Sequence, residues 1–234
     1  MEIPFFLSDI IDFVYPRLCY VCDSTLPRGI SNKCVQCRHD LKICDMYRVH
    51  ENEMLQRLWG RLDLVFGASM YRFYKGSKVQ GMIHKWKYQG YAEIGRYLGR
   101  EFGEFLLGVG SLKDLNGIIP VPLHPDRLRW RGYNQAQTFA EGLSEVLDIP
   151  VIADLITRKK NSVSQTGKGR EDRLLDLLNS FTWQKARYED PDGGHFMLVD
   201  DILTTGATIE AAARPFLELP KVRLSLATVA LGQK

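Results

Sequence analysis

The stretch His195–Ala213, HFMLVDDILTTGATIEAAA, combines three features that decide the fold. Phe196–Val199 is a short apolar run of the kind that forms a buried parallel strand. Asp200 and Asp201 follow this run, and Thr204–Thr208 then leads into an alanine-rich segment with high helix propensity. The order of strand, loop and helix predicts that a helix begins at the carboxyl end of a strand, where open α/β sheets bind their ligands.

The loop Thr204-Thr205-Gly206-Ala207-Thr208 has the properties of a phosphate site. The first N–H groups of a helix are free and lie at the positive end of its dipole. Gly206 allows the backbone to approach an anion closely, and the three threonine hydroxyls can add hydrogen bonds.

Asp200 and Asp201 need a different partner, because carboxylates repel phosphate. Vicinal ribose hydroxyls donate hydrogen bonds that carboxylates accept, and a metal ion is a further possibility. An acidic pair beside a phosphate loop therefore indicates a ribose 5-phosphate. The alternative is a strand that ends in a turn, with one aspartate capping the next helix; such a cap uses only one side-chain oxygen.

VDDILTTGAT closely resembles the phosphoribosyl-diphosphate (PRPP) motif of type I phosphoribosyltransferases. The resemblance implies that Asp200 and Asp201 hold the ribose 2′ and 3′ hydroxyls. It also implies that the loop Thr204–Thr208 holds the 5-phosphate.

The chain has 234 residues, of which 45% are hydrophobic and 25% charged, with a net charge of +3. These values are typical of a globular protein with a substantial core. No run of about 18 apolar residues is present, so we expect no membrane span. The N-terminus has no basic region before its apolar stretch, which makes it a poor signal peptide and favours the cytoplasm.

All five cysteines fall between Cys19 and Cys44, and four of them form two CxxC pairs, Cys19 with Cys22 and Cys34 with Cys37. Two such pairs complete a tetrahedral shell of four sulfurs that suits a structural zinc ion. A segment this small buries little apolar surface, so the metal would supply much of its stability.

Other interpretations of the cysteines remain. A redox-active CxxC is expected beside a strand and a helix, and disulfides are rare in a reducing compartment. Cys44 or His39 could replace one ligand, although the spacing favours the four paired cysteines.

We place a domain boundary near Gly60, which divides the chain into residues 1–60 and 61–234. The first part contains a short amphipathic helix over Ile3–Tyr15 that we expect to pack on the cysteine module, and a connector, Lys42–Arg61, with a helical stretch. A partner-binding or membrane-surface role for Ile3–Tyr15 is the alternative, but this segment lacks a basic face.

The second part alternates between strands and helices. Strands are predicted at Leu64–Tyr74, Asn116–Leu123, Pro150–Ile156 and Val222–Leu231, and helices at Lys78–Lys87, Tyr91–Leu107 and Ala136–Val146. This alternation implies a mostly parallel sheet flanked by helices. In the second helix we expect a core stripe made by Ile94, Leu98, Phe102 and Phe105. The lysines Lys75, Lys78, Lys85 and Lys87 form either a solvated face or an anion contact.

Two basic segments are candidate contacts for a diphosphate. Arg127, Arg129 and Arg131 form a cationic loop, and guanidinium groups bind phosphate oxygens in pairs. Arg158–Arg173 is polar and lacks a core pattern, which predicts a mobile loop that could close as a lid. In both cases the alternative is an exposed basic surface loop. Asn134 is expected to cap the helix that starts near Gln135, and His124 to be a turn residue.

Five stretches together resemble the ComF (competence protein F) family: the two CxxC pairs, YKGSKVQGMIHKWKYQG, PVPLHPDRLRWRGYNQA, the spacing of Gln165, Arg173 and Phe181, and VDDILTTGAT. The resemblance implies an α/β fold of the type I phosphoribosyltransferase kind with a small zinc-ribbon-like N-terminal module. Asp176 and Lys168 depart from the family pattern, which puts the choice of substrate in doubt.

The resemblance also implies roles for the cations. Arg127 and Arg129 would bind the diphosphate of PRPP, and Arg131 would assist its departure together with Lys160 of the flexible loop. Asp200 and Asp201 would take part in catalysis by holding the ribose. The implied cofactors are a structural zinc ion and magnesium with PRPP.

Two functions are compatible with these residues. The first is PRPP-dependent transfer, acting in DNA uptake during natural transformation or in related nucleotide metabolism. The second is a non-catalytic accessory that binds single-stranded DNA beside a helicase-like uptake protein. In the second case, basic residues interleaved with aromatic ones would bind the strand. The aromatic candidates are Trp86, Tyr88, Trp130 and Tyr133.

Overall fold

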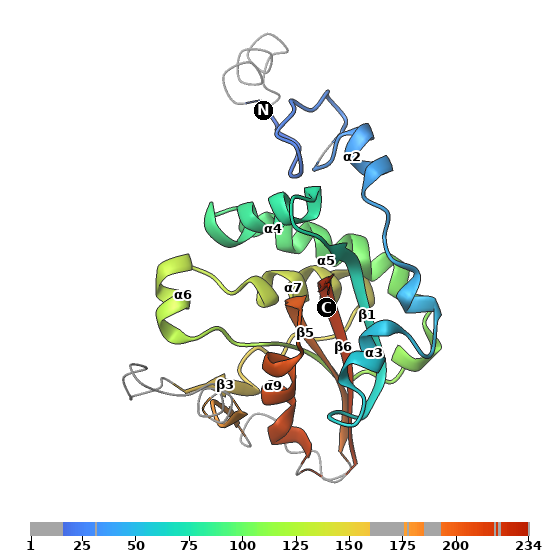
Figure 1. The fold of residues 1–234 in the computed structure, drawn as a ribbon, viewed down its shortest axis with the longest axis vertical. Helices are drawn as coiled ribbons and strands as arrows, with labels where there is room; N and C mark the ends of the chain where they lie inside the picture. Colours follow the sequence, from blue (N-terminus) through green and yellow to red (C-terminus); the bar gives the residue numbers. More distant parts are fainter. Residues whose placement is uncertain are drawn as a thin grey trace, which may run out of the picture.

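The computed structural model describes residues 16–30, 32–159, 176, 178–184, 193–217, 219 and 221–233 (Figure 1). The predicted helix over Ile3–Tyr15 lies outside the described residues. So does the predicted mobile loop beyond Lys159, including Lys160 and Lys168.

The main sheet has the strand order β1-β6-β5-β2, and all three neighbouring pairs are parallel. These strands are β1 (Leu64–Phe73), β2 (Gly117–Pro120), β5 (Gly194–Leu203) and β6 (Val222–Gly232). The predicted parallel α/β sheet is therefore confirmed. Both β5 and β6 lie inside the sheet with helices over both of its faces (Figure 1), which explains their nearly continuous apolar sequences.

The prediction of a strand over Pro150–Ile156 is wrong. Within this range only Val151 pairs with the main sheet, through a bridge to Ile118 of β2. The chain then turns, with the amide of Leu155 donating to the carbonyl of Ile152. This turn sends the following residues into a separate antiparallel pair. That pair consists of β3 (Ile156–Arg158) and β4 (Phe181–Trp183).

Helices cover both faces of the main sheet (Figure 1). They are α4 (Lys78–Tyr88), α5 (Ala92–Leu106), α7 (Gln135–Leu147) and α9 (Ala207–Leu217). The connection from β1 to β2 and the connection from β5 to β6 run in opposite directions across the sheet. Since parallel crossovers are right-handed, α5 and α9 lie on opposite faces, and α7 packs beside α5.

Helices α5 and α7 approach closely because each presents a glycine to the other. A Cβ atom on Gly99 would lie 2.2 Å from the carbonyl oxygen of Phe139, and one on Gly142 would lie 2.1 Å from that of Arg96. The rings of Phe102 and Phe139 stack beside this crossing, 6.3 Å apart. The close helix pair forms one wall of the core.

The predicted core stripe of α5 holds for three of its four residues. Ile94, Leu98 and Phe102 are fully buried, whereas Phe105 is 38% exposed. Phe105 lies near the helix end, where it meets the edge of Tyr47 in the 3-10 helix η1 (Asp45–Arg48) and not the sheet. Its inclusion in the buried stripe was therefore wrong.

The N-terminal module lies over α4 and α5, and ion pairs join the two parts (Figure 1). Lys78 pairs with Asp40 at the end of α2 (Val35–Asp40), and Lys85 pairs with Asp23, each at 2.6 Å. The fully buried Lys33 donates to both carboxylate oxygens of Glu101 on α5, also at 2.6 Å. Most of the predicted lysine face therefore contacts carboxylates of the protein itself.

The connector runs along β1 and contains η1 and α3 (Glu53–Leu58). Asn52 caps α3 by accepting from the amides of Met54 and Leu55, and its own amide donates to the carbonyl of Gly67 at 2.7 Å. A further 3-10 helix, η2 (Gly110–Leu112), precedes β2. Within the described residues, no helix combines the length and apolar character needed to cross a membrane.

Candidate functional site

Strand β5 carries both aspartates near its carboxyl end. The strand continues to Leu203, so Asp200 and Asp201 lie within it, whereas the sequence had predicted that they follow it. Successive strand residues face opposite sides of a sheet, but the amide of Asp201 donates to Oδ1 of Asp200 at 2.8 Å. This bond turns the Asp200 carboxylate towards the Asp201 backbone.

Charges around the aspartates oppose one another. Burial, and secondly the negative charge of Asp201, raise the pKa of Asp200 to about 7, while the charges of Lys87 and Arg158 act to lower it. Nζ of Lys87, on α4, lies 2.7 Å from Oδ2 of Asp201, and both side chains are at most 15% exposed. The site therefore contains two close carboxylates, and the nearby protein cations compensate their negative charge only in part.

The loop after β5 turns at Gly206, whose φ of +86° lies in the left-handed region that favours glycine. Helix α9 begins at the next residue, Ala207, whose amide donates to the hydroxyl of Thr205 at 3.4 Å. Thr204 and Thr205 are exposed, and Thr208 is half-buried. The predicted order of acidic pair, loop and helix start is confirmed.

The predicted cationic loop is a short helix, α6 (Pro125–Arg131), and its assignment as a loop was wrong. Pro125 occupies the first turn, where no N–H is needed, and Gly132 ends the helix with a φ of +79°. His124 is the N-cap and accepts from the amide of Asp126 at 3.3 Å. The histidine thus has the turn role expected from the sequence.

The arginines of α6 have different surroundings. Burial, and secondly the charge of the exposed Arg127, lower the pKa of Arg158, while the charge of Asp200 acts to raise it, so Arg158 lies near both Arg127 and Asp200. Arg129 pairs with Asp126 of its own helix. Arg131 donates to the side chain of Gln135 at 2.8 Å.

Three guanidinium groups among the described residues each retain a buried donor, those of Arg57, Arg131 and Arg158. Within the part of the chain that the structure describes, the buried Nε of Arg131 and the buried Nε of Arg158 have no hydrogen-bond acceptor. Arg158, which belongs to β3, lies over the ring of Phe181, 5.2 Å from its centroid. Buried donors without acceptors are costly, and an anionic ligand with several oxygens would satisfy them.

The four aromatic candidates divide into two pairs. Trp86 is fully buried, and Tyr133 is half-buried with its hydroxyl donating to the Trp86 carbonyl, so Trp86 cannot stack on a ligand. Tyr88 and Trp130 are 50% and 70% exposed, and their ring centroids lie 5.7 Å apart. Arg131 lies over the Tyr88 ring at 5.2 Å.

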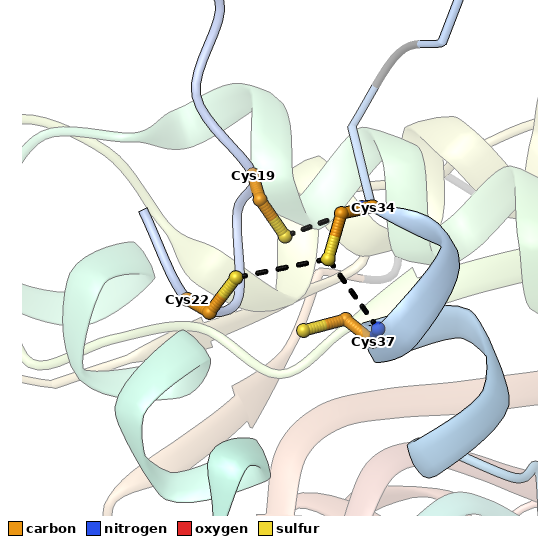
Figure 2. A group of neighbouring side chains, drawn as sticks. All are labelled: Cys19, Cys22, Cys34 and Cys37. Carbon is orange, nitrogen blue, oxygen red and sulfur yellow. Dashed lines mark hydrogen bonds between the residues drawn. The ribbon is translucent and has the colours of Figure 1, made fainter. Parts of the chain in front are cut away.

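The four paired cysteines converge on one point (Figure 2). Their sulfur atoms all lie within 4.8 Å of one another; the residues are Cys19, Cys22, Cys34 and Cys37. The sulfurs of Cys22 and Cys34 are 3.7 Å apart, and a tetrahedral zinc site with bonds of about 2.3 Å requires about 3.8 Å. The amide of Cys34 donates to the sulfur of Cys19, and that of Cys37 to the sulfur of Cys34. The donor set and its spacing fit zinc.

The two alternative ligands lie outside this group. Cys44 is half-buried, and its amide donates to the carbonyl of Met70 on β1. His39 is exposed and contacts Asp40. The preference for the four paired cysteines therefore agrees with the structure.

A serine, a histidine and an aspartate also meet at the opposite end of β5. Nδ1 of His195 donates to the carboxylate of Asp114 at 2.8 Å, and Nε2 of the same ring is hydrogen-bonded to the hydroxyl of Ser225 at 2.7 Å. Both His195 and Ser225 are fully buried, so no substrate can reach the hydroxyl. The arrangement joins the amino ends of β5 and β6 to the loop before β2, which contains Asp114, so its role is structural.

Sequence reasoning missed two cations of this site, Lys87 as a partner of Asp201 and Arg158 as a neighbour of Asp200. The lysine was noted among several others, and the arginine as the first residue of a basic segment. Neither position carries a local signal, because only the tertiary structure brings α4 and β3 to the end of β5.

Comparison with known proteins gives a family match to the phosphoribosyl transferase domain over residues 134–232. Competence protein F of Haemophilus influenzae is 34% identical over 139 residues, 57% of this chain and 59% of that protein. Competence protein ComFC of Bacillus subtilis is 28% identical over 211 residues, 88% of this chain and 80% of that protein. DNA utilization protein YhgH of Escherichia coli is 28% identical over 222 residues, 86% and 91% of the two chains.

The parallel sheet, the acidic pair of β5 and the domain match define a phosphoribosyltransferase-type α/β protein. Together with the relatives and the N-terminal cysteine cluster, they support a protein of the ComF type that carries such a domain.

Proposed function

We propose that the site at the carboxyl end of β5 binds PRPP with magnesium and that the protein acts in the handling of incoming DNA. The observation that carries the proposal is the order of three structural features along one chain segment. A carboxylate pair lies near the end of β5. The turn at Gly206 and the start of α9 follow within a few residues. Two carboxylates suit ribose hydroxyls, and a helix start suits the 5-phosphate.

The cations support a diphosphate beside the ribose. Arg127 and Arg158 lie near each other, and Arg158 and Arg131 each keep a buried donor without an acceptor. Like charges gathered in this way are stabilised by a polyanion. Magnesium, when bound, would neutralise part of the diphosphate charge and so make it a better leaving group.

In a transferase reaction, the bond between ribose C1 and the diphosphate oxygen breaks, and a nitrogen of the acceptor forms the new bond to C1. The carboxylates would hold the ribose while positive charge develops at its ring, and the arginines would receive the departing diphosphate. Arg131 and Lys160 are the proposed cations for that step. The cysteine cluster is proposed to hold a structural zinc ion.

Calorimetric titration of PRPP with magnesium into the zinc-loaded full chain tests the ribose-phosphate site. We expect binding by the wild type and its loss in the Asp200→Asn/Asp201→Asn double variant. Asp63→Asn, which removes an exposed carboxylate just before β1, at the opposite end of the sheet, is the matched control and should bind like the wild type. A folded wild type that binds no PRPP contradicts the proposal.

A second function, binding of single-stranded DNA, is favoured by one observation. Tyr88 and Trp130 are exposed, lie 5.7 Å apart and have Arg131 beside them, which forms a surface on which bases could stack. Relatives named for competence and for DNA utilization agree with such a role. DNA itself, or a base within it, is then a candidate acceptor.

Fluorescence anisotropy with a labelled oligonucleotide tests this second function. Affinity should fall steeply with salt, and a Tyr88→Ala/Trp130→Ala variant should bind more weakly at every salt concentration. Trp59→Ala is a suitable control, because Trp59 is also highly exposed, at 82%, but lies at the end of α3. Equal binding by all three proteins would exclude the aromatic pair from DNA contact.

A further inference from the structure

Two arginines of the connector contact the backbone of the Thr204–Gly206 loop. We propose that Arg57 and Arg61 are positioning residues, which aim the amide N–H groups of this loop at the 5-phosphate. The connector would then be part of the ribose-phosphate site, although it precedes β1 in the chain. This inference rests on the proposed function.

Arg57 belongs to α3 and is nearly buried, at 8% exposure. Its Nη1 donates to the carbonyl of Thr204 at 2.9 Å and to that of Gly232, at the end of β6, at 2.6 Å. Its Nη2 donates to Glu53 at 2.8 Å. One guanidinium group thus joins the loop to the carboxyl end of the neighbouring strand.

Arg61 follows α3 and contacts the next carbonyl of the loop. Its Nη2 donates to the carbonyl of Thr205 at 2.9 Å, and its Nη1 pairs with Glu210 in the first turn of α9 at 3.0 Å. The same Nη2 donates to the carbonyl of Arg57. Arg61 therefore bonds to the loop and to the helix that follows it.

Gly206 lies directly against the connector. A Cβ atom at this position would lie 2.5 Å from Cδ2 of Leu58 and 3.2 Å from Nη2 of Arg61. Glycine is thus needed here for its positive φ and for the close approach of α3.

The consequence follows from the planar trans peptide, in which the C=O and the next N–H point in opposite directions. No described residue follows a cis peptide bond. Bonds from Arg57 and Arg61 fix the carbonyls of Thr204 and Thr205 towards the connector. The amides of Thr205 and Gly206 must then point away from the connector, as donors for a phosphate.

The test compares Arg61→Gln and Arg61→Lys in the zinc-loaded full chain. Arg61 is preferred to the buried Arg57, because its side chain is 34% exposed and its loss leaves no large cavity. We expect Arg61→Gln to weaken binding of PRPP and of ribose 5-phosphate by about tenfold, with partial recovery in Arg61→Lys. Binding of magnesium diphosphate, which lacks the 5-phosphate, should be unchanged.

A matched control is Arg96→Gln, which also removes a surface arginine from an ion pair, with Glu145 on α7. It should change none of the three affinities. If Arg61→Gln binds PRPP like the wild type, or loses diphosphate affinity equally, the positioning role is wrong.

Amide hydrogen exchange in the ligand-free protein gives a second readout that needs no substrate. Exchange at the amide of Glu210, which donates to the carbonyl of Gly206 at 2.9 Å, should rise about tenfold in Arg61→Gln, while amides of α7 keep their protection. Unchanged exchange overturns the inference. A wild type that binds no PRPP refutes the proposed function, and the exchange result alone then decides whether Arg61 orders the loop.

Discussion

Nζ of Lys87 on α4 lies 2.7 Å from Oδ2 of Asp201 on β5, and both side chains are nearly buried. This ion pair brings a helix that contacts the N-terminal module to the carboxyl end of the central strand. It also places a cation where it influences the protonation of Asp200. The pair therefore connects the stability of the protein, its pH dependence and its proposed ligand binding.

The first prediction concerns the pH dependence of PRPP binding. Only an ionised carboxylate accepts hydrogen bonds from both ribose hydroxyls, and Asp200 has a pKa of about 7. Affinity should therefore rise between pH 6 and pH 8. Lys87→Gln removes a charge that lowers this pKa, so its midpoint should move to higher pH.

Calorimetry at three pH values measures this shift. Lys75→Gln serves as control, because Lys75 is an exposed lysine just before α4. An affinity that does not change with pH in the wild type would contradict a titration of Asp200 in this range.

The second prediction concerns stability. The pKa of Asp200 is raised from 3.8 to about 7 in the folded protein, so the native state binds the proton more tightly than the unfolded chain does. This contribution to stability is complete below about pH 4 and is lost as the pH rises through about 7. Asp200→Asn, which stays neutral, should therefore melt a few degrees above the wild type at pH 8.

Thermal melting followed by circular dichroism measures this effect at pH 8 and at pH 5. The advantage of Asp200→Asn should be smaller at pH 5. A variant that is less stable than the wild type at pH 8 would mean that the carboxylate makes contacts that outweigh its burial.

The third prediction concerns the cysteine cluster. Cys37→Ser removes one of four converging sulfurs, so the zinc content should fall from one ion per chain towards zero. Cys44→Ser should retain the metal, because Cys44 lies outside the cluster. Elemental analysis measures the content. Loss of zinc in both variants would contradict the assignment of the four ligands.

The fourth prediction concerns the contact between α5 and α7. A methyl group at Gly142 would lie 2.1 Å from the backbone carbonyl of Arg96, which cannot move without displacing α5. Gly142→Ala should therefore destabilise the protein by about 3 kcal/mol or more. Gly81→Ala, on α4 with open space around it, should instead stabilise by about 0.5–1 kcal/mol. Urea unfolding compares the two variants.

The sequence by itself determined the features that depend on local order. The apolar run, the acidic pair and the glycine turn before an alanine-rich helix occur within His195–Ala213, so the strand, the loop and the helix start could be read together. The CxxC spacing determined the four converging cysteines in the same way, because each pair lies within reach of one ion. Errors arose in segments with competing local signals. Pro125–Arg131 was predicted to be a loop and is a helix. Pro150–Ile156 was predicted to be a strand, but the chain turns away from the sheet after one bridge at Val151.

Only the tertiary structure decided which distant groups surround that segment. Lys87 reaches Asp201 because α4 ends near the carboxyl end of β5, and Arg57 and Arg61 reach the Thr204–Gly206 loop across about 150 residues of chain. Such contacts carry no periodicity or motif, since a single long side chain on an otherwise ordinary helix or connector makes them. The sequence thus determined the groups that would face a ribose phosphate. The folding of the sheet determined which cations balance those groups and which residues hold the loop in place.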